Sequence, residues 1–542
     1  MLSYRKLAMR VLGRPLHTGG GIDSPRPASQ RAAAFALTAA MLITLTAPAF
    51  AETWYIENGD ITVKASGTEG KNTVSQGDKK DVEDTNTIIT NQKTDTASSN
   101  TVTIDANGKN DKVEVTLKDV NIDTSSRKNA AVSVTGEGDT NIKLDGDNAL
   151  KSDTYRSGIA STGSLTISGG ENDSLTAQGG SGANGISSSG SLTISGGTVT
   201  ANGDDGGHGI YSRGGVTISG GSTVTAKGES GAISGGDGIR SDGGVTISGG
   251  TVNATGGNGG TISGGDGIRS GGGLTVSDGT VTAKGGNGDS KDGYGGDGIR
   301  SGGVVTISGN TVNAAGGYGG KVGGYGICSF DRVAISGGTV EAAGGNGSTG
   351  GGSGIYSSVI DLSGSLELTA KAGSPTGKAL LQNGRELDLD TIKDKLGPGA
   401  KVTTTDANGE TKEVSIPLPV EPEKPVIPEE SSSSSDGGSA TPSAPASPLP
   451  GLTVTDKDGQ RISYTSTQSG NTLTVCVGRF TASLRASLSA LRQLRAEGIE
   501  TITFQTILCS TTLSVDELLA MGGEDAEAVL THRSTDSSLT VG

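Results

Sequence analysis

The sequence predicts an all-β solenoid, a parallel β-helix with three strands per coil. The first observation is the tetrapeptide Gly-Ile-x-Ser, which recurs at spacings of roughly 24 to 31 residues. Each copy is followed by a Thr-Ile-Ser-Gly-Gly-like run and a Thr-Val-x-Ala-like run, with glycine between them, which indicates three strands and three turns per period. The chain also holds 94 Gly, 5 Phe and 1 Trp in 542 residues, so its core must come from small aliphatic side chains shared between stacked coils. The repeats begin at Gly158, Gly185, Gly209, Gly238, Gly267, Gly298, Gly326 and Gly354.

Alternation within each run predicts which side chains point into the solenoid. A nine-residue calcium-binding repeat, a leucine-rich repeat and a collagen repeat are all excluded by the period and by the composition. The residues expected to face inward are Ile239, Ile268 and Ile299 on the first strand, Ile218, Ile247 and Ile307 on the second, and Val252, Val281 and Val312 on the third.

Looser strand-like runs flank the regular coils on both sides. We expect the upstream runs to form the first coils and a cap, the run from Ile360 to Ala370 to form a last regular coil, and the segment from Lys378 to Val414 to close the end. The upstream runs are Trp54 to Val63, Asn100 to Ile104, Val113 to Ile122, Asn129 to Val134 and Asn141 to Leu150.

The first 51 residues are predicted to be an export signal. Six basic residues precede or border an apolar run from Ala32 to Leu45, and Ala49-Phe50-Ala51 supplies the small-x-small cleavage pattern. The run is too short and too rich in alanine for a membrane span. Removal of the export signal makes the mature chain more acidic than the formal net charge of −15 of the whole chain. This negative charge disfavours nucleic acid as a partner and favours the binding of divalent cations. We expect a secreted protein, extracellular or associated with the cell surface.

The composition divides the mature chain into three parts: the β-helix at 52–415, a Pro/Ser/Glu-rich linker at 416–450, and a small α+β domain at 451–542 whose function and partner the sequence does not indicate. Cys476 and Cys509 fall in this last domain, where their pairing stays open, while Cys328 is expected to be a small buried or edge residue. The elements expected in the domain are a strand at Leu473 to Val477, a helix carrying Leu484, Leu488 and Leu491 that stops at Gly498, a strand at Ile499 to Leu508, and a short helix capped by Ser514 and Glu517.

Equivalent positions of stacked coils form columns on the surface. The third residue of Gly-Ile-x-Ser should point outward, which would place Arg240, Arg269 and Arg300 one above another with Tyr211 and Tyr356 nearby. Guanidinium groups suit sugar carboxylates, and tyrosine rings suit sugar faces. A solvated stripe left by repeat duplication is the alternative interpretation. The full column reads Ala160, Ser187, Tyr211, Arg240, Arg269, Arg300, Cys328 and Tyr356.

Two further columns carry polar residues. Asp237, Asp266 and Asp297 lie two residues before the strand isoleucines, where they either bind Ca²⁺ with loop carbonyls or pair with the neighbouring arginines. In the Gly-Gly-Asn-Gly loops, Asn258, Asn287 and Asn346 are expected to be turn residues with a left-handed backbone. The whole second column reads Ser157, Asn184, His208, Asp237, Asp266, Asp297, Tyr325 and Ser353.

Four features together resemble a family of secreted bacterial carbohydrate-binding domain-containing proteins of the clostridial type. They are Trp54-Tyr55-Ile56, the stretch from Val115 to Ile122, the block from Asn129 to Val134, and the Gly-Ile-x-Ser coils, so the resemblance covers Glu52 to Ala372. The resemblance implies a right-handed parallel β-helix, related in shape to pectate lyases, that binds acidic or plant-type polysaccharide with calcium.

The sequence therefore predicts a secreted, non-catalytic polysaccharide-binding protein that uses the arginine column and is assisted by calcium. Catalysis is disfavoured because a site copied over an open face has no unique pocket in which to tune a pKa. Two alternatives stay open: a structural surface adhesin or stalk, and a pectate-lyase-like enzyme that degrades polysaccharide. Polysaccharide binding by the mature protein would separate the first alternative from the prediction.

Overall fold

A computed structural model describes residues 52–66, 70–418, 451–456, 459–462, 464–469, 471–477, 481–506, 510–521, 526–532 and 537–541. The predicted export signal and nearly all of the predicted linker lie outside these residues. The chain divides into two compact units, Met1–Pro422 and Glu423–Gly542, which are described separately below. Within the described ranges, no helix has the length and apolar character needed to cross a membrane.

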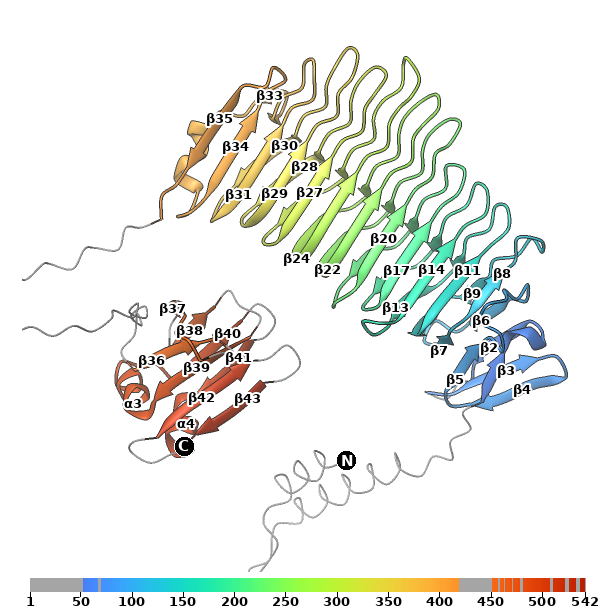
Figure 1. The fold of residues 1–542 in the computed structure, drawn as a ribbon, viewed down its shortest axis with the longest axis horizontal. Helices are drawn as coiled ribbons and strands as arrows, with labels where there is room; N and C mark the ends of the chain where they lie inside the picture. Colours follow the sequence, from blue (N-terminus) through green and yellow to red (C-terminus); the bar gives the residue numbers. More distant parts are fainter. Residues whose placement is uncertain are drawn as a thin grey trace, which may run out of the picture. The chain divides into compact units, whose positions relative to one another are not determined.

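The first unit is a β-solenoid of stacked coils, which confirms the predicted fold (Figure 1). Each regular coil contributes three strands, and each strand pairs in parallel with its counterpart in the next coil. In the later coils, the second and third strands merge into one long strand, or the first merges with the second.

The first strands of the coils form one parallel ladder, in which the Gly-Ile-x-Ser repeat runs from Gly158 to Ser357. They are β2 (Ile61–Ala65), β6 (Val102–Ala106), β9 (Val132–Gly136), β12 (Ile159–Ser161), β15 (Ile186–Ser188), β18 (Ile210–Ser212), β21 (Ile239–Ser241), β23 (Ile268–Ser270), β25 (Ile299–Ser301), β28 (Ile327–Ile335), β30 (Ile355–Leu362) and β32 (Leu380–Gln382).

The second strands follow after a short turn. They are β1 (Thr53–Tyr55), β5 (Thr87–Thr90), β7 (Lys112–Lys118), β10 (Asp139–Asp145), β13 (Ser164–Ser168), β16 (Leu192–Ile194), β19 (Val216–Ile218), β22 (Val245–Thr255), β24 (Leu274–Lys284) and β26 (Val305–Ile307), with the later parts of β28 and β30.

The third strands complete each coil before the glycine-rich loop. They are β8 (Asn121–Asp123), β11 (Asp147–Lys151), β14 (Ser174–Gln178), β17 (Thr198–Asn202), β20 (Thr223–Lys227), the later parts of β22 and β24, β27 (Thr311–Ala315), β29 (Gly338–Ala343), β31 (Leu366–Lys371) and β34 (Lys401–Thr405).

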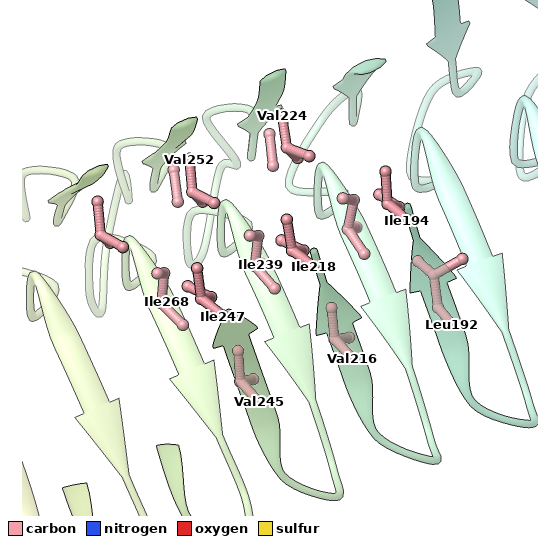
Figure 2. Close-up of a cluster of buried hydrophobic side chains, with 14 of the residues drawn as sticks. Leu192, Ile194, Val216, Ile218, Val224, Ile239, Val245, Ile247, Val252 and Ile268 are labelled. Atoms are coloured by element: carbon pink, nitrogen blue, oxygen red, sulfur yellow. The ribbon is translucent and has the colours of Figure 1, made fainter. Parts of the chain in front are cut away.

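One continuous apolar core runs along the axis of the solenoid. Figure 2 shows Ile194, Ile218 and Ile247 from successive coils pointing inward beside Val224 and Val252 of the third strands. All nine aliphatic residues predicted to face inward are fully buried, which confirms the face assignment from alternation. A single coil offers only a few such side chains, so stacking is required to remove them from water.

The serine of Gly-Ile-x-Ser is buried as well, and in the repeats from Ser188 to Ser329 its hydroxyl donates to a glycine carbonyl of the preceding coil. Ser241 donates to Gly214 at 2.8 Å, and Ser301 donates to Gly272 at 2.8 Å. A buried hydroxyl needs such a partner, so the recurrence of serine in the repeat has a structural reason.

The glycine-rich loops are stacked as closely as the strands. The N–H of Gly265 donates to Gly257 in its own loop, and the N–H of Gly286 in the next coil donates to Gly265, both at 2.8 Å. A Cβ atom on Gly286 would lie 2.0 Å from the carbonyl oxygen of Gly257. Glycine is therefore required here because neighbouring backbones leave no space for a side chain.

Antiparallel segments cap both ends of the solenoid. At the first end, a 3₁₀ turn, η1 (Ile56–Asn58), precedes β2. β3 (Asn72–Gln76) and β4 (Lys79–Asp84) then follow β2 and form an antiparallel meander with it. At the other end, β33 (Arg385–Glu386), η2 (Leu389–Lys395) and β35 (Thr411–Ser415) cover β32 and β34, which form one coil beyond the run from Ile360 to Ala370.

The second unit is a small α+β fold around its own apolar core, as predicted. Leu484 does not belong to a helix, as the sequence had suggested, but lies in a strand, where its alternation with Ala482 and Ala486 buries all three side chains. The helix begins after Ser487, whose hydroxyl accepts the N–H of Ala490. One sheet consists of β36 (Leu452–Thr455), β39 (Ala482–Ser487), β42 (Glu527–His532) and β43 (Ser537–Val541). A second sheet consists of β37 (Thr465–Ser469), β38 (Thr472–Cys476), β40 (Thr501–Gln505) and β41 (Ser510–Ser514). The described helices are α3 (Leu488–Ala496) and α4 (Val515–Met521).

Two sequence predictions for this unit meet the structure differently. The N–H of Glu517 donates to the hydroxyl of Ser514 at 3.4 Å, so Ser514 lies at the start of α4 as predicted. Cys509 lies outside the described residues, and its pairing with Cys476 stays open.

Candidate functional site

The three arginines of the repeat stand in register on the outer face of the first strands. Arg240 pairs with Arg269 across β21 and β23, and Arg269 pairs with Arg300 across β23 and β25. Their side chains are 35%, 45% and 36% exposed, which leaves each guanidinium accessible at the surface. Tyr211 precedes them in the same column, and Cys328 and Tyr356 follow.

A buried aspartate lies behind each of these arginines. One carboxylate oxygen faces the arginine three residues later, at 3.8 Å for Asp237, 3.7 Å for Asp266 and 3.2 Å for Asp297. The other oxygen accepts a backbone N–H of the next coil at 2.7 Å, from Asp266, Asp297 and Tyr325 in turn. We call Asp237, Asp266 and Asp297 the aspartate ladder. Pairing with arginine, one of the two roles considered from the sequence, is the arrangement observed.

His208 continues the aspartate ladder toward the N-terminus. Its Nδ1 accepts the N–H of Asp237 at 2.7 Å, and its backbone N–H donates to Asn184 Oδ1 at 2.9 Å. Burial lowers the pKa of His208 to about 4, and the positive charge of Arg240 acts in the same direction. The imidazole is therefore neutral at physiological pH and acts as a hydrogen-bond acceptor in the column.

The carboxyl groups of the aspartate ladder ionise with difficulty. Burial raises the pKa of Asp266 to about 7, and the adjacent Asp237 carboxylate adds to the increase. Burial likewise raises the pKa of Asp297 to about 7, with a contribution from Asp266, and it raises the pKa of Asp237. The net charge of the arginine face therefore changes near neutral pH: it is nearly balanced when the carboxylates are ionised and positive when they are protonated.

Aromatic side chains lie at both ends of the arginine column. At one end, the hydroxyl of Tyr211 donates to Asp242 at 2.8 Å, and the guanidinium carbon of Arg240 lies 5.9 Å from the centre of the Tyr211 ring. At the other end, Tyr356 stacks on Tyr325 with their ring centres 5.0 Å apart and their planes inclined by 16°. The column thus combines cationic groups with flat apolar surfaces.

Phe330 was not identified from the sequence as part of this face. Its ring is 53% exposed, and the guanidinium carbon of Arg300 lies 5.2 Å from its centre. The segment around it reads Cys328-Ser-Phe-Asp331, where other coils have Arg-Ser-Gly-Gly or a close variant, so a departure from the repeat marked the position. Cys328 itself is fully buried, as expected, and burial raises the pKa of its thiol.

The asparagine column differs from the prediction. Asn258, Asn287 and Asn346 do not belong to the residues with a left-handed backbone. The amide oxygen of Asn258 instead accepts the N–H of Asn287, and that of Asn287 accepts the N–H of Tyr318, each at 2.9 Å. The left-handed assignment was wrong because the loops stack in register, which lets each amide satisfy the backbone of the next coil without a tight turn.

The aspartate ladder does not fit a calcium site, because both oxygens of each carboxylate already face a backbone N–H or a guanidinium. Across the described part of the chain, no three His, Cys, Asp or Glu side chains gather as a metal-binding group. Calcium dependence of ligand binding stays a prediction for experiment.

Residues 83–351 match a family described as carbohydrate-binding domain-containing protein. Most of the solenoid is therefore similar to this family. The matched segment runs from β4 to the loop after β29 and includes all three arginines, while Tyr356 and the second unit lie outside it. Neither the curated proteins nor the solved structures contain a match to the chain.

Proposed function

We propose that the solenoid is a non-catalytic module that binds an extended acidic polysaccharide along the arginine column. The observation that carries the proposal is the register of Arg240, Arg269 and Arg300, which lie on three consecutive coils within the segment that matches a carbohydrate-binding family. Tyr211 and the Tyr325–Tyr356 stack extend this face at its two ends.

The chemistry of the column suits a polymer that carries carboxylates. A guanidinium binds a carboxylate with two parallel hydrogen bonds, and its charge is independent of pH in the physiological range. The strands that carry successive arginines are separated by about 4.8 Å, the usual distance between paired strands. A chain with its own repeat meets several of them at once, so weak contacts add through effective concentration.

Support for a non-catalytic role comes from what the acid–base groups behind the face already do. The carboxylates of the aspartate ladder each accept a backbone N–H, and His208 Nδ1 accepts another. These groups hold the coils together and are not directed at a ligand on the outer surface. The three arginines repeat one environment, whereas a catalytic centre needs one distinct environment.

We further propose that the protein acts outside the cell. The support is the predicted export signal, which lies outside the described residues, together with the acidic charge of the remaining chain. The second unit has no assigned task in this proposal.

Affinity electrophoresis of the mature protein in gels that contain polygalacturonate, with neutral dextran as the comparison polymer, tests the function. We expect retardation by polygalacturonate and at least a tenfold loss of affinity when Arg240, Arg269 and Arg300 are all changed to Ala. Parallel gels with calcium and with EDTA test the predicted role of calcium.

A matched triple variant removes the same charge from another face of the solenoid. Lys227, Lys284 and Lys371 are exposed residues of the third strands, and their combined change to Ala should leave binding intact. An equal loss in both triple variants would reduce the effect to net charge and refute the arginine column as the site. Failure to bind any polysaccharide would refute the function and favour a structural or adhesive role.

A further inference from the structure

A cavity opens in the first coils of the solenoid, where the second strands differ in length. β5 begins at Thr87, which pairs with Val115, whereas β7 already begins at Lys112. The start of β7 is therefore not covered by a strand on this side, whereas β10 pairs with β7 over its whole length. The cavity at this step has a volume of about 420 Å³, within the range of pockets that hold small molecules.

Most of the residues that line the cavity are of polar type. The lining includes the side chains or backbone of Asn86, Glu114, Thr116, Asn141 and Thr166. Asn141 Nδ2 donates to Glu114 Oε2 at 3.2 Å, so these two residues form a connected amide–carboxylate pair. The charged lining residues, Lys112, Glu114 and Asp139, include both signs, so the cavity is not a strongly cationic or anionic site.

The cavity also lies at the end of a straight column of polar side chains, in which Glu114 is the first. Glu114, Asn141 and Thr166 are in register across β7, β10 and β13, and the column continues as Thr193 and Thr217 on the next two coils. A polymer that follows this column toward the N-terminal end would reach the cavity with its last unit.

We propose that this cavity binds a single uncharged sugar unit, either free or at the end of a polysaccharide chain. The site is separate from the arginine column, which lies on the first strands of later coils and takes acidic groups. Amides, hydroxyls and one carboxylate in a small concave space match the many donors and acceptors of a sugar ring. The mixed charges of the lining discriminate against strongly charged ligands.

Saturation-transfer NMR on the mature protein tests the site with glucose, galactose, mannose, xylose and N-acetylglucosamine, each also as its β-1,4-linked disaccharide. We expect at least one of these sugars to bind. Thr166→Trp adds bulk to the lining of the cavity and should weaken this binding at least tenfold. The matched control is Thr193→Trp, one coil further along the same column and outside the cavity. Tighter binding of the disaccharide would identify a chain end as the ligand, and equal binding would identify a free sugar.

Glu114→Gln and Asn86→Ala test the same site without added bulk, because both side chains are exposed and the changes preserve the strands. Each should weaken the sugar severalfold, while the triple Arg→Ala variant should bind it as the native protein does. The proposal is overturned if none of the sugars binds, if Thr166→Trp binds normally, or if Thr193→Trp loses binding equally. Gels with polygalacturonate on the same samples separate this outcome from a failure of the arginine column.

Discussion

Replacement of Asp266 by Asn should stabilise the solenoid above neutral pH. Asp266 is the middle member of the aspartate ladder, so it has one ionisable neighbour on each side, Asp237 and Asp297. Asn keeps the oxygen that accepts the N–H of Asp297 and removes the negative charge. The perturbation therefore isolates electrostatics from the hydrogen bond that connects the coils.

The magnitude follows from the spacing of the charges. Carboxylates about 4.8 Å apart repel by roughly 3.5 kcal/mol at an effective dielectric constant of about 20, so two ionised neighbours oppose the charge on Asp266 by roughly 7 kcal/mol. Arg269 lies 3.7 Å away and attracts it by about 4.5 kcal/mol on the same scale, an upper value because the guanidinium is 45% exposed. Removal of the charge should therefore raise the free energy of unfolding by roughly 1–3 kcal/mol at pH 8.

The sign of the pH dependence follows from the raised pKa. Because the pKa of Asp266 rises from 3.8 to about 7 on folding, the native protein loses stability as pH increases from about 4 through 7, and the loss then levels off. The asparagine of the variant does not titrate, so the advantage of Asp266→Asn should be largest at pH 8 and smallest near pH 4.

Thermal unfolding followed by circular dichroism at pH 4.5, 6 and 8 measures this difference. Asp289→Asn is the matched control, because Asp289 is an exposed residue of a glycine-rich loop. A melting temperature of Asp266→Asn below that of the native protein at pH 8 would refute the reasoning. So would an advantage that is equal at all three pH values.

Three further predictions concern the face, the core and the loops. Affinity for polygalacturonate should increase as pH falls from 8 to 6, because protonation of the aspartate ladder leaves the positive charge of the arginines uncompensated while the sugar carboxylates stay ionised. Affinity electrophoresis at both pH values measures this change, and a decrease in affinity would contradict the prediction. Ile247→Ala should destabilise the solenoid by about 2–5 kcal/mol in denaturant titrations because its side chain is fully buried, and a change below about 1 kcal/mol would contradict the shared core. Gly286→Ala should lower the melting temperature by several degrees because its Cβ would lie 2.0 Å from a carbonyl oxygen. Gly221→Ala should have little effect because no atom lies within 4 Å of the position of its Cβ. Equal melting temperatures of the two variants would contradict the close stacking of the loops.

Much of the fold follows from the periodicity of the sequence. Within a strand, side chains alternate strictly between the two faces, so the repeat alone indicated that Ile247 and Val281 face inward and that Arg240, Arg269 and Arg300 align on the surface. Because the coils repeat, one correct assignment applies to all of them. The parallel pairing and the three strands per coil were predictable for the same reason.

Residues at the bends between strands were not predictable in this way. Asp266 lies two residues before its strand isoleucine, where the chain turns, and alternation does not determine whether a side chain at a turn points inward. Its burial and its hydrogen bond to the next coil became visible only once the coils were stacked. Asn287 was assigned to a tight turn because local rules for loops do not include contacts between loops of adjacent coils.

The sequence by itself determined the repeat, the inward aliphatic residues and the register of the arginine column, because these depend on period and alternation. Tertiary structure alone decided that the aspartates are buried, that Phe330 contacts Arg300, and that a polar cavity opens beside the start of β7. These features depend on how one coil meets the next and on where a strand of one coil is shorter than its neighbour. No local pattern of residues contains that information, since it arises from contacts between segments separated by a full coil.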